Sequence, residues 1–258
     1  MIFDSIERAI ALESSHVAAA IANATMREYP SPHIHVESLF SDTFYARLLA
    51  MFPRNPQAFV RWAHGGDPTV FFGNYDRRRE INFPNDLVRL NEDQREFWSA
   101  MDAYLCGYEF ARILVDKFHA CLMARFGNDL DDTHFIEKRM RGAAMLNAHD
   151  PDYYLGPHTD RYEKIITCVF YMPERTELDH LGTALYDPLE AGFTCRGTVH
   201  HDPAKFVLRE IVPFRPNSAF IFARSDVLFH GVERIAPDSA MGSERPGFQM
   251  QFWERAGS

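Results

Sequence analysis

Apolar residues recur at helical spacing over the N-terminal part of the chain. Ile6, Ile10, Val17 and Ile21 fall on one face of an Ala-rich stretch. This spacing predicts one or two helices. The sequence YPSP at residues 29–32 ends them, because proline fixes φ and removes a backbone donor.

A short helix is predicted over residues 43–52. Ser41 or Asp42 can cap its N-terminus, and Pro53 stops it. The following residues 54–86 are rich in Gly, Pro, Asn and Arg, and we expect them to be irregular.

A second helical block is predicted from about Asn91 to Phe126, where apolar residues again follow a helical period. Gly107 is expected to separate two helices, and Gly127 to end the second. The first half of the chain should therefore be mainly helical.

After Asp132 the pattern changes to short apolar runs separated by Pro, Gly and Asp, which is typical of a β-sandwich or barrel. No linker separates the two halves. We therefore predict one α+β domain over residues 1–258, with 1–130 as mainly helical support and 131–258 as a jelly-roll core (a double-stranded β-helix, cupin-like). The apolar runs are KIITCVFYMP, KFVLREIVPF, SAFIFA, DVLFHGV and GFQMQFW.

The composition is that of an acidic globular protein. The chain has 258 residues, 46% of them hydrophobic, and a formal net charge of −9, so it can form a large core but has no net basic footprint. Nucleic acid and anionic membranes are therefore disfavoured as partners, and no apolar run approaches the roughly 18 residues of a membrane span.

The four cysteines form no CxxC pair and are expected to be reduced thiols. Charged residues near the N-terminus interrupt any signal-peptide core, so we expect a cytoplasmic protein.

Two histidine–aspartate pairs could supply metal ligands. His158 and Asp160 are two residues apart, as are His200 and Asp202. On a strand this spacing puts both side chains on one face, from which they can converge on one ion. A second histidine from elsewhere would complete a set of two histidines and one carboxylate, which leaves metal positions open, as non-haem Fe(II) oxygenases require.

The sequence context favours the first pair. His158 follows a turn and precedes the apolar strand KIITCVFYMP, and His230 lies 72 residues later at the end of another apolar strand. In a jelly roll, a gap of that size lets ligands on the first and seventh strands meet. The rival pair lies in residues 198–204, which are typical of a hairpin tip. We therefore interpret His158, Asp160 and His230 as the metal ligands.

These motifs resemble a known family. The segments GPHTD, KIITCVFYMP, NSAFIFARSDVLFHGVERI and ERPGFQMQFW look like the iron(II)- and 2-oxoglutarate-dependent dioxygenases, near the prolyl-4-hydroxylase-like branch. The resemblance extends roughly from Phe135 to Trp253, with a weaker similarity in residues 32–53. It implies a jelly roll, Fe(II) held by the histidine–aspartate–histidine set, 2-oxoglutarate and O2 as co-substrates, and release of succinate and CO2.

The resemblance also implies a role for Arg245. In the family an arginine or lysine on the strand after the distal histidine binds the far carboxylate of 2-oxoglutarate, and Arg245 stands 15 residues after His230. Its permanently charged, bidentate fork suits a buried carboxylate. The alternative is a solvated loop arginine beside Glu244. Arg234 competes for the role, but we expect it to lie in the loop after His230.

Other candidates carry weaker signals. Thr167 and Tyr171 lie on one face of a predicted strand and could contact the co-substrate, or could be core residues. Asn147, on the apolar strand before the metal site, could reach 2-oxoglutarate or a water molecule. The cluster Arg77, Arg78 and Arg79 is interpreted as a solvated face, as most runs of charge are. The alternative is a lid that recognises an anionic substrate group.

The favoured function is hydroxylation of an unactivated C–H bond in a small polar molecule. The sequence resembles oxygenases that act on free or modified amino acids more than those that act on peptides. Related radical halogenases lack the carboxylate, so Asp160 favours hydroxylation over halogenation, with desaturation and cyclisation as alternatives. Alternative substrates are a nucleotide or other anionic metabolite, or a peptidyl proline. Alternative functions are a zinc hydrolase and a non-catalytic cupin-like binding module. A homodimer is left open.

Overall fold

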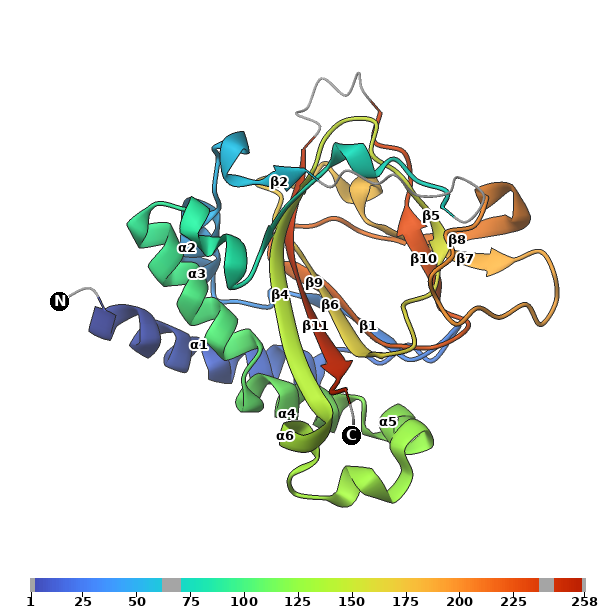
Figure 1. Ribbon diagram of the computed structural model, residues 1–258, viewed down its shortest axis with the longest axis horizontal. Coiled ribbons are helices and arrows are strands. Elements are labelled where there is room, and N and C mark those ends of the chain that lie inside the picture. Colours follow the sequence, from blue (N-terminus) through green and yellow to red (C-terminus); the bar gives the residue numbers. More distant parts are fainter. Residues whose placement is uncertain (1–2, 62–70, 237–243, 257–258) are drawn as a thin grey trace.

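Two antiparallel β-sheets form the centre of the molecule (Figure 1). The structure is a computed structural model that describes residues 3–61, 71–236 and 244–256. The larger sheet runs in the order β1 (His33–Glu37), β9 (Ser218–Ala223), β6 (Lys164–Tyr171), β11 (Arg245–Glu254), β4 (Met140–His149), β3 (Arg78–Asn82) and β2 (Val60–Arg61). The smaller sheet runs in the order β5 (Leu155–His158), β10 (Phe229–Val232), β7 (Thr183–Pro188) and β8 (Phe206–Val212).

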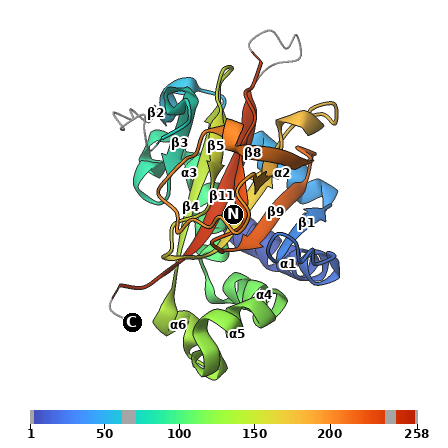
Figure 2. The ribbon, with the colours of Figure 1, turned by 90° about the vertical axis from the view of Figure 1, so that its right-hand side faces the viewer.

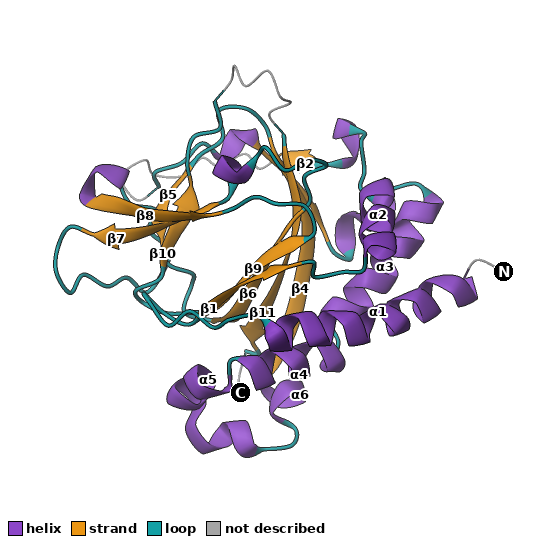
Figure 3. Ribbon diagram, turned by 180° about the vertical axis from the view of Figure 1, so that it is seen from behind, coloured by secondary structure: helices purple, strands orange, loops and turns teal. Residues whose placement is uncertain are grey.

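The main helices cover the outer face of the larger sheet, away from the smaller one (Figures 1 and 3). Figure 2 shows the same arrangement from the side of the smaller sheet. The α-helices are α1 (Phe3–Asn23), α2 (Asp42–Met51), α3 (Glu92–Leu105), α4 (Tyr108–Lys117), α5 (His119–Phe126) and α6 (Phe135–Arg139). Short 3-10 helices are η1 (Pro56–Ala58), η2 (Tyr75–Arg77), η3 (Asn85–Arg89), η4 (Gly127–Asp131), η5 (Asp179–Leu181) and η6 (Pro203–Lys205).

Side chains alternate between two environments along the strands of the larger sheet. On β11, Phe248, Met250 and Phe252 point outward and join the apolar core beneath the helices. The residues between them, Gln249 and Gln251, point into the space between the sheets. The period of two thus separates the residues that pack against the helices from the residues that face the space between the two sheets.

The predicted helices are present, with one difference in number. The N-terminal pattern forms the single helix α1, and Ser41 caps α2 by accepting a hydrogen bond from the Phe44 amide. The block from Asn91 to Phe126 contains three helices instead of two, because the chain breaks at Phe118 as well as at Gly107. Local periodicity cannot reveal a break that leaves the apolar spacing intact.

The expectation of an irregular segment over residues 54–86 was wrong for part of it. Strand β3 lies there and pairs with β4, and β2 pairs with β3. Strand β1, also from the first half of the chain, pairs with β9. The helical first half therefore also extends the larger sheet at both edges.

No described helix combines the length and the apolar character that crossing a bilayer would require. All four cysteines are free thiols.

Candidate metal centre

His158 and His230 face each other across two neighbouring strands. His158 ends β5, His230 lies on β10, and the two are direct cross-strand partners with ring centroids 4.3 Å apart. The two strands approach so closely that residue 231 must be glycine, since a Cβ there would lie 2.3 Å from the Leu155 carbonyl oxygen. Strand register therefore brings together two imidazoles that are 72 residues apart in the sequence.

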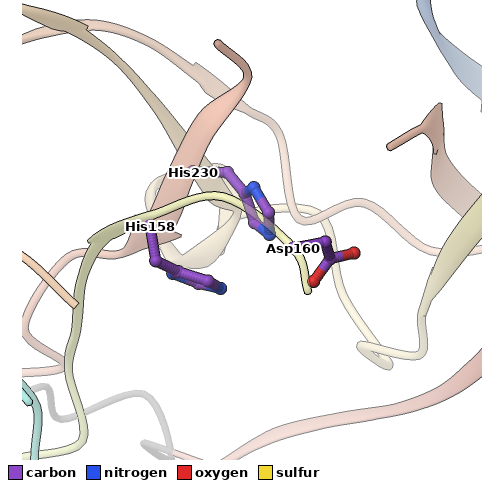
Figure 4. A group of neighbouring side chains, drawn as sticks. All are labelled: His158, Asp160 and His230. Atoms are coloured by element: carbon purple, nitrogen blue, oxygen red, sulfur yellow. The ribbon is translucent and has the colours of Figure 1, made fainter. Parts of the chain in front are cut away.

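Asp160 completes a cluster of three predicted ligands. It follows β5 directly, and one ligand atom from each of His158, Asp160 and His230 lies within 4.8 Å of the other two (Figure 4). Among the described residues this is the one group of three His, Cys, Asp or Glu side chains close enough to share a metal ion. Two imidazoles and one carboxylate form the set that holds non-haem Fe(II) and leaves positions open.

Hydrogen bonds determine which nitrogen of each imidazole is free. His158 Nδ1 lies 3.1 Å from the Gly156 carbonyl oxygen, and His230 Nδ1 lies 3.1 Å from the Leu228 carbonyl oxygen. A carbonyl oxygen only accepts, so Nδ1 carries the proton and Nε2 keeps its lone pair. Burial lowers the pKa of both histidines, and His230 and His200 lower that of His158 further. Both rings are thus held neutral, as metal binding requires.

Two neighbours hold the carboxylate of Asp160. Thr167 Oγ1 donates to Oδ2 at 2.5 Å, and Lys164 Nζ donates to Oδ1 at 2.6 Å. Burial by itself would raise the pKa of Asp160, but the charge of Lys164 and the hydrogen bonds from Lys164 and Thr167 outweigh it, and the pKa falls below its ordinary value. Asp160 is therefore ionised. Thr167 lies against the carboxylate of the predicted ligand Asp160, and Lys164 is a residue of the candidate site that the sequence did not single out.

The three ligands line a cavity of about 300 Å³ between the two sheets. Its walls carry mostly polar or charged side chains, whereas ligand pockets are usually lined by apolar ones. The polar residues that line it, besides the ligands, are Tyr75, Arg78, Glu80, Asn82, His149, Tyr153, Lys164, Thr167, Thr183, Arg245, Gln249 and Gln251.

Arg245 lies at the start of β11, buried in the wall of this cavity with 3% of its surface exposed. It donates to the Leu181 carbonyl oxygen through Nε and lies 3.5 Å from Thr183 Oγ1 through Nη2. Among the described residues it forms no ion pair with a carboxylate. Burial therefore lowers its pKa. The alternative of a solvated loop arginine is wrong, and the cavity contains a buried cation without a counter-ion.

His149 was missed at the sequence level. It lines the cavity, stacks on Tyr153 at 4.1 Å between ring centroids, and has Nδ1 3.2 Å from Arg245 Nη1. A guanidinium only donates, so Nδ1 accepts and the ring proton sits on Nε2, which is buried and has no hydrogen-bond partner among the described residues. Burial, Arg245 and Arg78 keep its pKa well below the ordinary value. A period of two from Asn147 along the same strand would have indicated His149.

Tyr171 and Asn147 lie near this end of the cavity. Tyr171 is buried, donates to Thr183 Oγ1 at 2.6 Å, and has its ring centre 5.5 Å from the Arg245 guanidinium carbon. Asn147 alternates with Met145 and His149 on the cavity side of β4 and is buried, and no described residue forms a hydrogen bond with its Nδ2. Their contact with a co-substrate stays a prediction.

The arginine cluster does not form a solvated face. Only Arg77 is exposed, whereas Arg78 and Arg79 are buried in β3. Arg78 lines the cavity beside Glu80, and Arg79 on the opposite face pairs with Asp150 at 2.7 Å. The solvated interpretation fails because the local charge run does not reveal a strand whose two faces are both covered.

The rival ligands occupy other places. Asp202 caps η6 by accepting from the Ala204 amide at 2.9 Å, so it does not join His200 in a ligand pair. His200 nevertheless packs against the His158 ring with centroids 4.4 Å apart, which the hairpin interpretation did not anticipate. Arg234 lies in the loop after β10 as expected, and pairs with Asp152 at 2.7 Å.

The comparisons with known proteins rest on structure. Neither a protein-family model nor a curated protein matches the amino-acid sequence. Among solved structures, the chain is similar to a Pseudomonas putida prolyl-4-hydroxylase, at 14% identity over 93% of this chain and 99% of the other, with a TM-score of 0.51.

Two further structures are similar at lower TM-scores. An oxidoreductase of the 2OG-Fe(II) oxygenase family from Burkholderia pseudomallei has 12% identity over 93% of this chain and 89% of its own, with a TM-score of 0.46. HygX from Streptomyces hygroscopicus, solved with nickel and 2-oxoglutarate bound, has 14% identity over 86% of this chain and 82% of its own, with a TM-score of 0.45. The likeness to the P. putida enzyme confirms the predicted α+β fold with a double-stranded β-helix core.

Proposed function

We propose that this protein is a non-haem Fe(II)- and 2-oxoglutarate-dependent dioxygenase that hydroxylates an unactivated C–H bond of a small polar molecule. One observation carries the proposal. The cavity that contains the cluster of His158, Asp160 and His230 also contains Arg245, a buried cation without a carboxylate partner among the described residues. An unpaired buried charge is costly, so this wall is suited to an anionic ligand.

The residues present fit both the metal and the co-substrate. His158 and His230 each offer an Nε2 lone pair, and Asp160 offers an ionised carboxylate. Arg245 supplies a charged fork at which a carboxylate could bind, beside the Thr183 hydroxyl and close to Tyr171. A dicarboxylic 2-oxo acid therefore fits a cavity with the metal ligands on one wall and Arg245 on another.

When bound, Fe(II), 2-oxoglutarate and O2 supply the oxidising chemistry, with succinate and CO2 as the co-products. The chain's own residues position and protect. Thr167 and Lys164 fix the orientation of the Asp160 carboxylate, and the Nδ1 hydrogen bonds fix the two imidazoles. Arg245 would hold the distal carboxylate of the co-substrate. The surrounding apolar cluster between the sheets limits the access of water.

A free or modified amino acid is the favoured substrate, because the cavity is small and its walls carry both charges and amide groups. A peptidyl proline, the kind of substrate that the name of the similar P. putida enzyme suggests, and an anionic metabolite are the alternatives. A zinc hydrolase would leave Arg245 without a role, and a binding module would leave the open metal positions without one.

An anaerobic titration tests the proposal. Fe(II) and 2-oxoglutarate added together should give the weak visible absorption band of their chelate, and the protein should release succinate once air is admitted. His158→Ala should abolish both signals because it removes a ligand. His119→Ala, which removes an exposed histidine of α5, should retain both. Absence of the band and of succinate in the unmodified protein would refute the proposal, and Zn(II)-dependent hydrolysis would then favour the hydrolase.

A further inference from the structure

Strand β3 presents a pair of opposite charges to the cavity. Arg78 and Glu80 are two residues apart, so both face the same side of the sheet, and both line the cavity shared with the metal ligands. Arg78 Nε forms an ion pair with Glu80 Oε1, and the two side chains are 10% and 7% exposed. Among the described residues, neither side chain forms a hydrogen bond or ion pair with His158, Asp160 or His230, and the function proposed above assigns the pair no role.

The surroundings of the pair are arranged for polar recognition. Arg78 Nη2 donates to Gln249 Oε1 at 3.2 Å, and the guanidinium carbon lies 5.8 Å from the centre of the Tyr75 ring. Buried Arg78 Nε is close to Glu80 but makes no hydrogen bond of good geometry with any residue that the structure describes. Asn82 continues the same face of the strand into the cavity. The wall therefore offers a cation, an anion and neutral amides side by side.

A buried ion pair of this kind contributes little to stability, since apolar residues of similar volume often serve as well or better. Separating its charges is expensive, because each would remain uncompensated. A ligand with only one charge would pair with either Arg78 or Glu80 and leave the other without full compensation. A ligand with a carboxylate and an ammonium group keeps both of them paired.

The spacing of the charges narrows the ligand further. Because the Arg78 and Glu80 groups are in contact, the two charges of the ligand must also be close together. They are close in an α-amino acid, where one carbon bears both groups. They are absent from a residue inside a peptide chain, where both groups have become amides.

We propose that Arg78 and Glu80 bind the carboxylate and the ammonium group of a free α-amino acid, which is the substrate of this enzyme. The role of this amino acid as the substrate rests on the proposed function, whereas its binding to Arg78 and Glu80 does not. Arg78, supported by Gln249, takes the carboxylate, and Glu80 takes the ammonium group. Internal peptide residues and metabolites with a single charge are excluded by the same pair.

The test combines ligand modification with matched variants. Each of the twenty free L-amino acids is titrated by calorimetry into the protein loaded anaerobically with Fe(II) and 2-oxoglutarate, and succinate release is measured under air. For the best amino acid, its N-acetyl and its carboxamide derivatives should bind at least about 30-fold more weakly, because each leaves one charge unpaired. Glu80→Gln should strongly weaken binding of the free amino acid but should change binding of the N-acetyl derivative little. Arg78→Gln should likewise weaken binding of the free amino acid but should change binding of the carboxamide little.

A loss of affinity that depends on both the variant and the ligand derivative cannot arise from a general loss of structure, which would weaken the binding of all ligands alike. Arg77→Gln, which alters the exposed neighbour of the pair, serves as the matched control and should bind all ligands as the unmodified protein does. Equal binding of the free and the derivatised amino acids, or equal losses for all ligands in both variants, would overturn the proposal. So would preferential binding of a singly charged metabolite or a peptide.

The proposed function can fail separately. Coupled binding of a free amino acid without 2-oxoglutarate-dependent succinate release would support the amino-acid site and refute the oxygenase. Succinate release that is stimulated equally by N-acetyl and free amino acids would support the oxygenase and refute the site.

Discussion

On strand β11, Phe248, Met250 and Phe252 face the helices and belong to a continuous apolar core, whereas Gln249 and Gln251 face the cavity. The inner face is not polar throughout, because Val169, Phe220 and Phe222 on β6 and β9 belong to an apolar cluster between the sheets. At the end of the sheet where β11 begins, Arg78, His149 and Arg245 form one cross-strand row that joins β3, β4 and β11. Around the cavity, the two faces of β3, β4 and β11 therefore differ in chemistry.

The difference separates stability from function. The outer face buries apolar area against helices, which stabilises the fold in proportion to that area. The inner face buries charges, of which Arg245 has no carboxylate partner among the described residues, and such charges reduce stability unless a ligand compensates them. Substitutions on the two faces should therefore change different measurable quantities.

The largest effect is expected on the outer face. Phe248 is buried, stacks on Phe170 at 4.0 Å between ring centroids and packs on Trp98. Phe248→Ala should lower the free energy of unfolding by about 3–5 kcal/mol, measured by denaturant titration with far-UV circular dichroism. Gln249→Ala, its neighbour on the inner face, should cost only about 1 kcal/mol. Similar losses in both variants would contradict the separation of the two faces.

The next largest effect is expected on the inner face, where a substitution should change ligand affinity instead of stability. Arg245→Met should raise the dissociation constant of 2-oxoglutarate about 30-fold or more, equivalent to about 2 kcal/mol, in anaerobic calorimetry with Fe(II). The free energy of unfolding without ligand should stay the same or rise, because a buried unpaired charge is replaced by an apolar chain. Arg234→Met, on the exposed arginine that pairs with Asp152, is the matched control. If the Arg245→Met variant lost stability but kept its affinity for 2-oxoglutarate, Arg245 would be a structural residue.

Sequence reasoning reached the candidate ligand set because most of its signals are local. His158 and Asp160 are two residues apart beside a predicted strand, and His230 lies in another apolar run, 72 residues later, a gap that suits two strands of a jelly roll. Arg245 could be identified only through the resemblance, since nothing nearby in the sequence shows that it would be buried.

The rest of the site depends on contacts between distant segments. Arg78 and Glu80 face the cavity because β3 pairs with β4, and the Gly- and Pro-rich sequence around β3 concealed that strand. His149 acquires its role from Arg245, which lies 96 residues away in the chain. Pairing register and burial of this kind are set by the whole fold, and a periodic pattern does not contain them.

A smaller effect concerns the partner of the metal carboxylate on the inner face. Thr167→Val removes the hydroxyl that donates to Asp160 Oδ2 but keeps the shape of the side chain. The dissociation constant of Fe(II), measured by anaerobic titration, should rise about tenfold, because partners of this kind orient the ligand. Thr183→Val alters another buried threonine of the cavity, one bonded to Tyr171 instead, and should leave Fe(II) affinity unchanged. Equal changes in both variants would point to a general effect of the cavity.

The smallest effect tests how far the inner-face cations influence stability through pH. Burial, Arg245 and Arg78 lower the pKa of His149 in the folded protein, so the unfolded chain binds more protons below the ordinary histidine pKa of about 6.5. The stabilisation by neutral His149 is thus complete above that pH and is lost as the pH falls below it. Between pH 7 and pH 6 it should account for about 0.7 kcal/mol of the fall in the free energy of unfolding, which His149→Gln should remove from denaturant titrations at the two pH values. His119→Gln, on the exposed histidine of α5, should keep the unmodified dependence. An unchanged slope in His149→Gln would mean that His149 can be protonated in the folded protein, and that the row of Arg78, His149 and Arg245 is less isolated from solvent than its burial indicates.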